Sequence, residues 1–456
     1  MPLIVNSTLM AEKWNNKALF RLIWPLIIEQ ILAVTMGVAD TVMISPVGEF
    51  AVSGVNIIDN INNLLVIAFI ALSTGGAVVC SHYIGRQEPK NASLAARQLV
   101  YFVTLISVVI MILALFFRQQ VISLLYGYLE DDVMRASMVY LLITALSYPA
   151  LALYNSCAAL FRSIGNSKVP MRIALMVNII NIGGNALFIY VMRMGVAGVA
   201  LSTLLSRIAA AVVLVVLLVK DQSSPVSLAG IQKITLIPAM LKRILRIGVP
   251  TGLENTMFQI GRLLTQRIFP MFGTSVIAAN AVTSVITSIS FMPGMAYGMA
   301  LLTVVGQCSG AEDYEAAKTN TVKLLKVAWI TVLCIAIPTF FLRGWVAGLF
   351  NLSPEAQSYA KLFLSIHCIF MSIGWTFSFA LPNALRAAGD AKFTMLIGSI
   401  SMWTVRVSGA YFFTFTLGLG PAGVWLAMGM DFLSRGTCFF LRWRSNRWQA
   451  KKLITD

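Results

Sequence analysis

Charged residues are scarce in this chain: they make up 11% of its 456 residues, against 58% hydrophobic residues. Soluble domains carry about 25% charged residues, so the composition excludes a water-soluble protein of this size. The two histidines are isolated and the six cysteines have no paired spacing, which argues against a metal site of these residues or a disulfide framework. The chain also lacks a GxxxxGK[ST] loop and an HExxH motif. Neither an ATP-driven pump nor an enzyme is therefore expected, and no cofactor is implied.

Long apolar windows are abundant instead, and each is long enough to cross about 30 Å of hydrocarbon. All should be helical, because lipid cannot satisfy an open backbone. Residues 1–17 contain Glu12 and Lys13 and lack a signal-peptide pattern, so the first span is expected to stay in the mature protein. The sequence predicts an all-α polytopic membrane protein with twelve transmembrane helices near 18–44, 52–80, 99–126, 136–160, 170–192, 195–219, 244–271, 276–306, 324–350, 358–384, 393–417 and 419–441.

The net charge of +16 is distributed unevenly along the chain. Most lysines and arginines lie in the N-terminal segment, the even-numbered loops and the C-terminal run "RWRSNRWQAKK". Because basic loops stay in the cytoplasm, both termini are predicted to be cytoplasmic, in a multi-pass protein of the cell (inner) membrane. The tail reads as an anchor at lipid headgroups, and no nucleic-acid partner is expected.

An internal duplication is visible as a constant offset between the two halves of the chain. "WPLIIEQ" contains Pro25 and Glu29, and "VPTGLEN" contains Pro250 and Glu254 at the same spacing. "FRSIGNSK" at 161–168 is matched by "LRAAGDAK" at 385–392, at nearly the same offset. The pattern predicts two six-helix halves related by pseudo-two-fold symmetry around a central cleft, an architecture used by transporters. The expected parts are a lobe at 1–219, a cytoplasmic linker at 220–242 and a lobe at 243–456 with the basic tail.

Polar side chains in the first half suggest a cation site. Glu29 and Asp40 are three helical turns apart and so share nearly one face. Amide and hydroxyl oxygens are suitable ligands for a hard cation, although such groups also serve simply to bond membrane helices together. The candidates are Asn155, the stripe Asn178, Asn181 and Asn185, and Ser202, Thr203 and Ser206.

The chain resembles the multidrug and toxic compound extrusion family over essentially its whole length. The resemblance rests on Pro25 followed by Asp40 in "VADTVMIS", on "HYIGRQ" and "RSIGNSK", and on "NIINIGGNALFI" and "WTVRV". Among the branches of that family, the chain is most similar to the one named for a DNA-damage-inducible bacterial protein. The resemblance implies export of organic compounds by alternating access, coupled to an ion gradient.

The resemblance also implies an ion site in the first half. It would contain Asp40, Asn155, Asn181 and Asn185. Several relatives have an aspartate where this chain has Asn185, so the coupling ion is left open between a proton and sodium. Burial disfavours a charged carboxylate and would let Asp40 take up a proton, whereas sodium would hold it ionised. No other metal is expected.

The second half departs from that pattern. Thr265 stands at the position of Asp40, and Arg406 falls near the position of Asn181. Some branches have an acid eight residues after the proline of the seventh helix, but here that residue is Phe258. The two halves are thus expected to share the same arrangement of helices, but only the first is expected to contain the ion site.

Glu29 and Glu254 are symmetry mates and are expected to face each other across the cleft, where they would favour cationic substrates. The alternative is that each pairs with an arginine such as Arg207 or Arg262, or seals a gate. Gln259, Met295 and Trp375 are further candidates for the cleft or substrate wall, although ordinary helix packing is the better explanation for Met295 and Trp375. Arg207, Arg262, Arg406 and Asp431 are interpreted as structural charge partners.

The function expected from the sequence is a proton- or sodium-coupled antiporter that exports organic, cationic or amphiphilic compounds. The expected partners are small-molecule substrates and membrane lipid, and a monomer is expected. The main alternative is a lipid-linked saccharide flippase of the same superfamily. A major facilitator porter also has two six-helix halves, but "GRQEPKNA" is a poor match to its loop motif.

Overall fold

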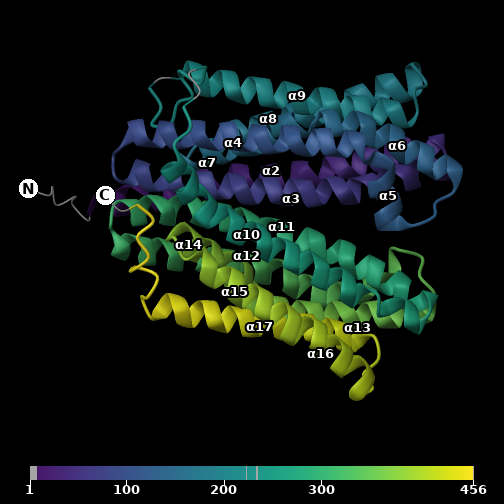
Figure 1. Ribbon diagram of the computed structural model, residues 1–456. Coiled ribbons are helices and arrows are strands. Elements are labelled where there is room, and N and C mark those ends of the chain that lie inside the picture. The colour runs from purple at the N-terminus through teal and green to yellow at the C-terminus, as the bar shows by residue number, and fades with distance from the viewer. Residues whose placement is uncertain (1–7, 222, 233–234, 455–456) are drawn as a thin grey trace, which may run out of the picture. The chain divides into compact units, whose positions relative to one another are not determined.

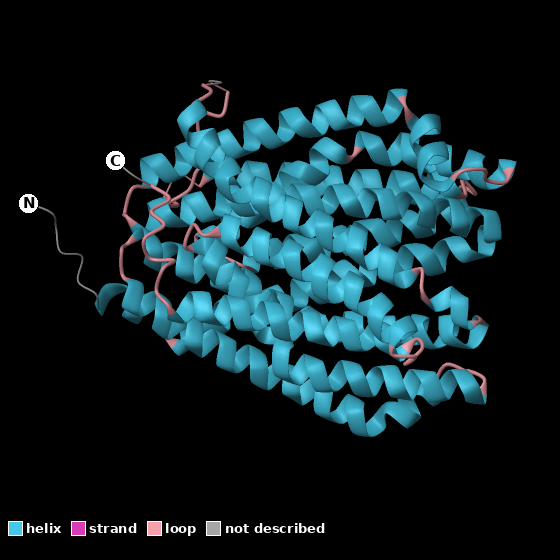
Figure 2. Cartoon of the chain, turned by 60° about the horizontal axis from the view of Figure 1, so that its bottom comes forward, coloured by secondary structure: helices cyan, strands magenta, loops and turns pink. Residues whose placement is uncertain are grey.

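A computed structural model describes residues 8–221, 223–232 and 235–454 of the chain. Within these residues the regular structure is entirely helical (Figure 2). The helices form twelve membrane-spanning segments, as the sequence predicts. A short helix, α1 (Thr8–Lys13), precedes them.

The first six spans include two interrupted ones. The fourth is divided between α6 and α7, and the fifth ends in the π-helical turn η2. The elements of this half are α2 (Asn16–Ile44), η1 (Ser45–Val47), α3 (Glu49–Gly85), α4 (Pro89–Phe116), α5 (Arg118–Tyr126), α6 (Asp131–Leu146), α7 (Tyr148–Ser163), α8 (Lys168–Asn185), η2 (Ala186–Val191) and α9 (Val196–Lys220).

The last six spans contain more π-helix, in the tenth and eleventh segments. Their elements are α10 (Pro238–Gln266), η3 (Phe269–Phe272), α11 (Thr274–Gly310), α12 (Tyr314–Gly348), α13 (Pro354–Phe370), η4 (Met371–Ala380), α14 (Leu381–Ala387), α15 (Ala391–Ser401), η5 (Met402–Val407), α16 (Ser408–Tyr411), η6 (Phe412–Thr416) and α17 (Ala422–Arg444).

The spans differ in how apolar they are. Eight described helices are long and apolar enough to cross a membrane, and the pair α6 and α7, bent by 49°, forms a ninth. The other three segments, α10, 391–416 and α17, contain ionisable residues within their length. Charge inside a membrane segment is costly and is normally retained for a function, so these three segments, together with α2, which contains Glu29 and Asp40, are places to look for one.

The described chain divides into two compact units, Phe20–Gly248 and a second composed of Met1–Leu19 with Val249–Asp456. In the first, α3 packs against α4, α6 and α7, and α9 packs against α6, α7 and α8. In the second, α11 contacts α12, α13 and α14, and α17 packs against α13 and η4. Figure 1 shows that the helices of each unit run roughly side by side.

The turns between spans show the duplication in the backbone itself. Residues with positive φ occur at equivalent positions in both halves. A positive φ is uncommon for any residue other than glycine. Equivalent loops therefore fold in the same way despite different side chains. The pairs are Gly48 and Gly273, Gln87 and Glu312, Gly165 and Gly389, Arg193 and Gly418, and Gly195 and Gly420.

The connection between the halves is docked on the first unit and does not stand apart as a linker. The Tyr101 hydroxyl donates to the carbonyl of Ile231 at 2.6 Å, and the Ser227 amide donates to Ser93 Oγ at 3.0 Å. Val226 is fully buried. The unit boundary thus falls after Gly248, inside α10, and not at the predicted residue 242.

The start of α10 packs closely on α3. A Cβ added at Gly75 would collide with the Ile244 carbonyl and the Gly248 backbone. Glycine is therefore needed for this approach. The contact fixes the first turns of α10 on the unit that contains α3.

Candidate functional site

Asp40 lies at the centre of a buried polar cluster in the first unit. The Asn185 side-chain amide donates to Asp40 Oδ1 at 2.6 Å and also approaches Asn181 Oδ1 at 3.5 Å. Asn181 and Asn185 are one helical turn apart on α8, so both amides point to the same side. Asp40 comes from α2, and the cluster therefore joins the first and fifth spans.

The sixth span completes the cluster. Asn181 Nδ2 donates to Thr203 Oγ1 at 3.3 Å, and Ser202 Oγ donates to the Asn181 carbonyl at 3.1 Å. A Cβ on Gly184 would collide with Ser202 Oγ, so the glycine permits α8 and α9 to come this close. Asp40, Asn181, Asn185 and Thr203 are all buried.

The chemistry of this cluster suits a small cation. It combines one carboxylate with amide and hydroxyl oxygens, the ligands that hard cations prefer. Asn185 Oδ1 is buried and accepts no hydrogen bond, an arrangement that costs free energy unless something else uses the oxygen. Among the described residues there is no group of three or more His, Cys, Asp or Glu residues that could hold a metal. The donor set around Asp40 therefore does not resemble a transition-metal centre.

Two of the predicted amides are directed elsewhere. Asn155 donates to the Leu151 carbonyl at 3.0 Å, and Asn178 donates to the Ala174 carbonyl at 2.9 Å, each within its own helix. Their amide nitrogens therefore do not extend the hydrogen-bonded chain from Asp40 to Thr203. The amide nitrogens on α8 are divided: those of Asn181 and Asn185 lie in the cluster, and that of Asn178 is bonded to the backbone. Asn178 Oδ1, like Asn185 Oδ1, is buried and accepts no hydrogen bond.

A second carboxylate, Asp59 on α3, was not identified from the sequence. The Tyr140 hydroxyl donates to Asp59 Oδ1 at 3.1 Å, and Asn62 Nδ2 lies 3.5 Å from the same oxygen. Asp59 interacts electrostatically with Asp40, and Arg207 interacts with both carboxylates. Its signal in the sequence is the same as that of Asp40, an acid within an apolar window.

The two symmetry-related glutamates each have an arginine partner in their own unit. Arg162 Nη1 lies 2.6 Å from Glu29 Oε1, and Arg386 Nη2 lies 2.7 Å from Glu254 Oε2. The two arginines are themselves repeat mates, from "FRSIGNSK" and "LRAAGDAK". The arginines considered as partners from the sequence, Arg207 and Arg262, are therefore not the ones that pair with these glutamates. Because each carboxylate is already paired with an arginine, the two glutamates give little reason to expect a cationic substrate.

Arg207 instead donates to Ser147 Oγ at 2.7 Å. This contact directs it to the bend between α6 and α7, in the first unit, and not to Glu29. Arg207 thus belongs with the carboxylates Asp40 and Asp59, with which it interacts electrostatically.

The aromatic candidate Trp375 belongs to a buried core cluster. It is fully buried and stacks on Phe291 and Phe379 at ring-centroid distances of 5.3 and 5.4 Å. This burial fits a packing role, and a contact of Trp375 with substrate stays a prediction. Met295 has 51% of its surface exposed, and Gln259 is half-buried.

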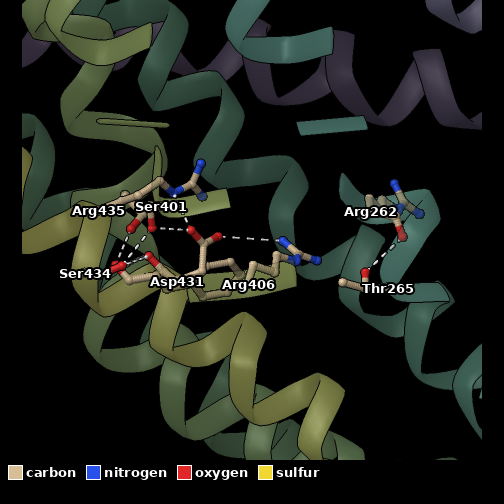
Figure 3. A network of polar contacts seen from close by, with 9 residues as sticks. Arg262, Thr265, Ser401, Arg406, Asp431, Ser434 and Arg435 are labelled. Carbon is tan, nitrogen blue, oxygen red and sulfur yellow. Dashed lines mark hydrogen bonds and ion pairs between the residues drawn. The ribbon is translucent and has the colours of Figure 1, made fainter. Parts of the chain in front are cut away.

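A polar network in the second unit links α15, η5 and α17 (Figure 3). Arg406 Nη1 lies 3.9 Å from Asp431 Oδ2, and Arg435 Nε lies 3.4 Å from Asp431 Oδ1. Ser401 Oγ donates to Asp431 Oδ1 at 2.7 Å. Arg435 was not singled out from the sequence, and Arg262 interacts electrostatically with Arg406. Asp431 is therefore shared between two arginines, with a third positive charge in reach.

Comparison with known proteins decides the family. The MatE family model matches residues 25–187 and again residues 250–412, at the same offset that separates Pro25 from Pro250. The chain belongs to this family. As a MatE protein it is a multi-pass membrane transporter, related over most of its length to multidrug efflux proteins.

Its MatE relatives cover nearly the whole chain. The uncharacterized transporter YisQ of Bacillus subtilis (strain 168) is 30% identical over 444 residues, 95% of each chain. The probable multidrug resistance protein NorM of Thermotoga maritima is 26% identical over 96% of this chain and 94% of its own. A crystal structure of a MATE protein in the bent conformation matches with a TM-score of 0.90, 19% identity and 98% coverage of each chain. That likeness shows the twelve-helix fold.

Proposed function

We propose that this protein is a cation-coupled antiporter that exports organic compounds across the cell membrane by alternating access. The observation that carries the proposal is the buried cluster of Asp40, Asn185, Asn181 and Thr203, in which one carboxylate is surrounded by uncharged oxygen and nitrogen groups. A single buried acid can exchange one monovalent cation, which is what coupling to a gradient requires. The relatedness to probable multidrug resistance proteins supports organic compounds as cargo.

The same cluster can serve a proton or a sodium ion. In the protonated state, Asp40 is neutral and its burial is inexpensive. In the sodium-bound state, the carboxylate stays ionised and the amide and Thr203 oxygens complete the coordination after the side chains rotate. In either case, the ion enters from outside, where its activity is high, and its release inside resets the site for another cycle.

The orientation that we propose follows from the basic residues. With Arg86, Lys90 and the tail arginines Arg442 and Arg444 in the cytoplasm, both termini are inside. Substrate would then be collected from the cytoplasm and released outside. We place the protein in the cell membrane as a monomer.

The test is efflux of organic dyes, cationic and anionic, from proteoliposomes, with a proton gradient or a sodium gradient imposed separately. We expect one gradient to drive efflux and the Asp40→Asn variant to reduce it to background while the protein still inserts and folds. The matched control is Asp132→Asn, which removes an exposed carboxylate in the same unit and should leave efflux unchanged. A well-inserted Asp40→Asn protein that pumps at the wild-type rate would overturn the proposal, and export of lipid-linked saccharides in its place would indicate a flippase.

A further inference from the structure

The polar network of the second unit occupies the place in the repeat that the Asp40 cluster occupies in the first. At the offset that relates the two halves, Thr265 corresponds to Asp40 and Arg406 corresponds to Asn181. In the first half, this place has a carboxylate and amides, which suit a cation. In the second half, arginine replaces the amide and threonine replaces the acid. The charge at these equivalent positions therefore changes from negative to positive.

Positive charge exceeds negative charge in this network. Arg406 and Arg435 share the single carboxylate of Asp431, and Arg262 adds a third guanidinium within electrostatic reach of Arg406. Figure 3 shows Asp431 between Arg435 and Arg406, with Arg262 on the neighbouring helix. The two ion-pair distances, 3.4 and 3.9 Å, are longer than the 2.7–2.9 Å of a charge-assisted hydrogen bond. Asp431 thus compensates its arginines only in part.

Arg435 has hydrogen-bond donors to spare. Its side chain is buried, with 3% of the residue exposed. Nε lies 3.4 Å from Asp431 Oδ1 without forming a hydrogen bond, and Nη2 has no hydrogen-bond partner. A buried guanidinium with unmet donors is costly. An anionic oxygen placed beside it would satisfy the donors and the excess charge together.

Aromatic rings lie against the same guanidinium groups. Phe258 is contacted by both arginines, with the Arg406 and Arg435 Cζ atoms 5.1 and 5.3 Å from its centroid. Phe379 lies 4.5 Å from Arg435 Cζ and packs edge-on against Phe258. Both rings are half-buried. They offer an apolar surface directly beside the positive charge.

We propose that Arg406 and Arg435 form a binding site for the anionic group of an apolar organic compound: a carboxylate, sulfonate or phosphate. The planar guanidinium forks would hold its oxygens in pairs, while Phe258 and Phe379 contact its apolar body. Asp431, held by Ser401, is the internal counter-ion that keeps the two arginines in place when the site is empty. This inference rests on the proposed export function for its biological meaning, since it makes organic anions or zwitterions the substrate class.

The experiment is equilibrium binding to the full-length protein in phosphatidylcholine nanodiscs, with no ion gradient. The probes are 2-naphthalenesulfonate and its uncharged analogue 2-naphthalenesulfonamide, which share the apolar body and differ in charge. We expect the wild-type protein to bind the sulfonate at least tenfold more tightly than the sulfonamide. Arg406→Gln and Arg435→Gln should abolish that preference, and Arg435→Lys, which keeps the charge but loses the fork, should retain part of it.

A matched control and one variant of opposite sign sharpen the result. Arg343→Gln removes a guanidinium that also lies over a ring in this unit, 4.4 Å from Phe340, and should leave the preference unchanged. Asp431→Asn removes the competing carboxylate and should tighten sulfonate binding several-fold, an effect that a purely structural ion pair would not produce. Adding phosphatidylglycerol to the nanodiscs distinguishes a lipid phosphate as the occupant. In that case sulfonate affinity falls in the wild-type protein and does not change in Arg406→Gln.

Equal affinity of the wild-type protein for the two probes would overturn the inference without any variant. So would an equal loss in Arg343→Gln, or weaker sulfonate binding in Asp431→Asn. Failure of the proposed function is distinguishable, because Asp40→Asn should lose gradient-driven efflux while its sulfonate binding is unchanged. A protein that binds the sulfonate yet pumps under neither gradient would keep the anion site and lose the antiport.

Discussion

Asp40 does not act alone, because Asp59 and Arg207 belong to the same electrostatic group. With both acids ionised, one arginine faces two carboxylates. A cation at Asp40 then restores the balance of charge. The composition of this group, and not Asp40 by itself, sets how strongly the first unit attracts a cation.

Replacing Asp59 with Asn should therefore weaken coupling-ion binding by about three- to tenfold, since Arg207 would then oppose a cation at Asp40 alone. Adding Arg207→Gln to Asp59→Asn should recover most of the loss. The measurement is the ion concentration for half-maximal efflux in proteoliposomes, compared over the four proteins of the double-mutant cycle. An unchanged half-maximal ion concentration in Asp59→Asn, or a further loss when Arg207→Gln is added, would contradict this account of the charge balance.

Asn185→Asp should convert the cluster into a stronger cation site. The new carboxylate would stand where an amide now lies 2.6 Å from Asp40, so sodium should bind roughly tenfold more tightly, about 1.4 kcal/mol. Sodium-dependent thermal stabilisation in detergent measures the change. Asn178→Asp adds the same charge on the same helix but outside the cluster, and a similar gain there would contradict the assignment.

At the scale of helices, the repeated element is an ion pair that joins the first span of each half to the fourth. Glu29 on α2 pairs with Arg162 on α7, and Glu254 on α10 pairs with Arg386 on α14. Each glutamate lies four residues after a proline within its helix, Pro25 or Pro250. Proline removes a backbone hydrogen bond, so the ion pair fixes the helix close to its weakest turn.

Breaking one of these pairs should destabilise the protein, whereas removing both partners should not. Because the Glu29 and Arg162 side chains are 8% and 17% exposed, we expect Glu29→Gln to cost about 2–3 kcal/mol. The double variant Glu29→Gln with Arg162→Gln should recover most of that stability in thermal unfolding. For comparison, Glu315→Gln, which breaks an exposed pair with Lys318, should cost under about 1 kcal/mol.

How far the sequence predicts these elements depends on the kind of signal. Spans and duplication are predictable because hydropathy and a constant offset persist along much of the chain. The convergence of Asp40 with Asn181 and Asn185 follows from helical spacing together with the family resemblance. The partner of Glu29 is Arg162, three spans further along the chain, and no periodicity indicates it. Arg435 stands one helical turn after Asp431 on the same helix, an i, i+4 spacing that indicates this pair from the sequence but was not used, whereas the approach of Arg406 to Asp431 follows only from the fold.

The whole molecule is two units of one fold with opposite polarity at equivalent places. The first has an acid among amides, and the second has arginines around one acid. A protein that holds a coupling cation in one half and an organic anion in the other would separate the two ligands by charge as well as by position. The two sites then would not compete for the same side chains.

The orientation of the whole chain can be tested by cysteine labelling. Cys334 is an exposed native cysteine, so the six native cysteines are replaced first. We then expect a cysteine at Glu49 or Glu355 to react with an impermeant reagent in intact cells, and one at Arg86 or Lys90 to react only after permeabilisation. Labelling at Arg86 from outside would reverse the orientation and, with it, the direction of transport.

The docking of the connection on the first unit has a consequence for split proteins. A cut between Ser223 and Ser224 would place residues 224–248 on the C-terminal fragment, although they fold with the N-terminal unit. The C-terminal fragment would then carry a segment that normally packs on the N-terminal unit. This segment contains the buried residues Val226 and Leu228 and the backbone that packs against Gly75. Two such fragments, produced separately, should find each other and co-purify through this segment. A cut just after Gly248 leaves the segment on the N-terminal fragment, so co-purification through this segment is no longer expected.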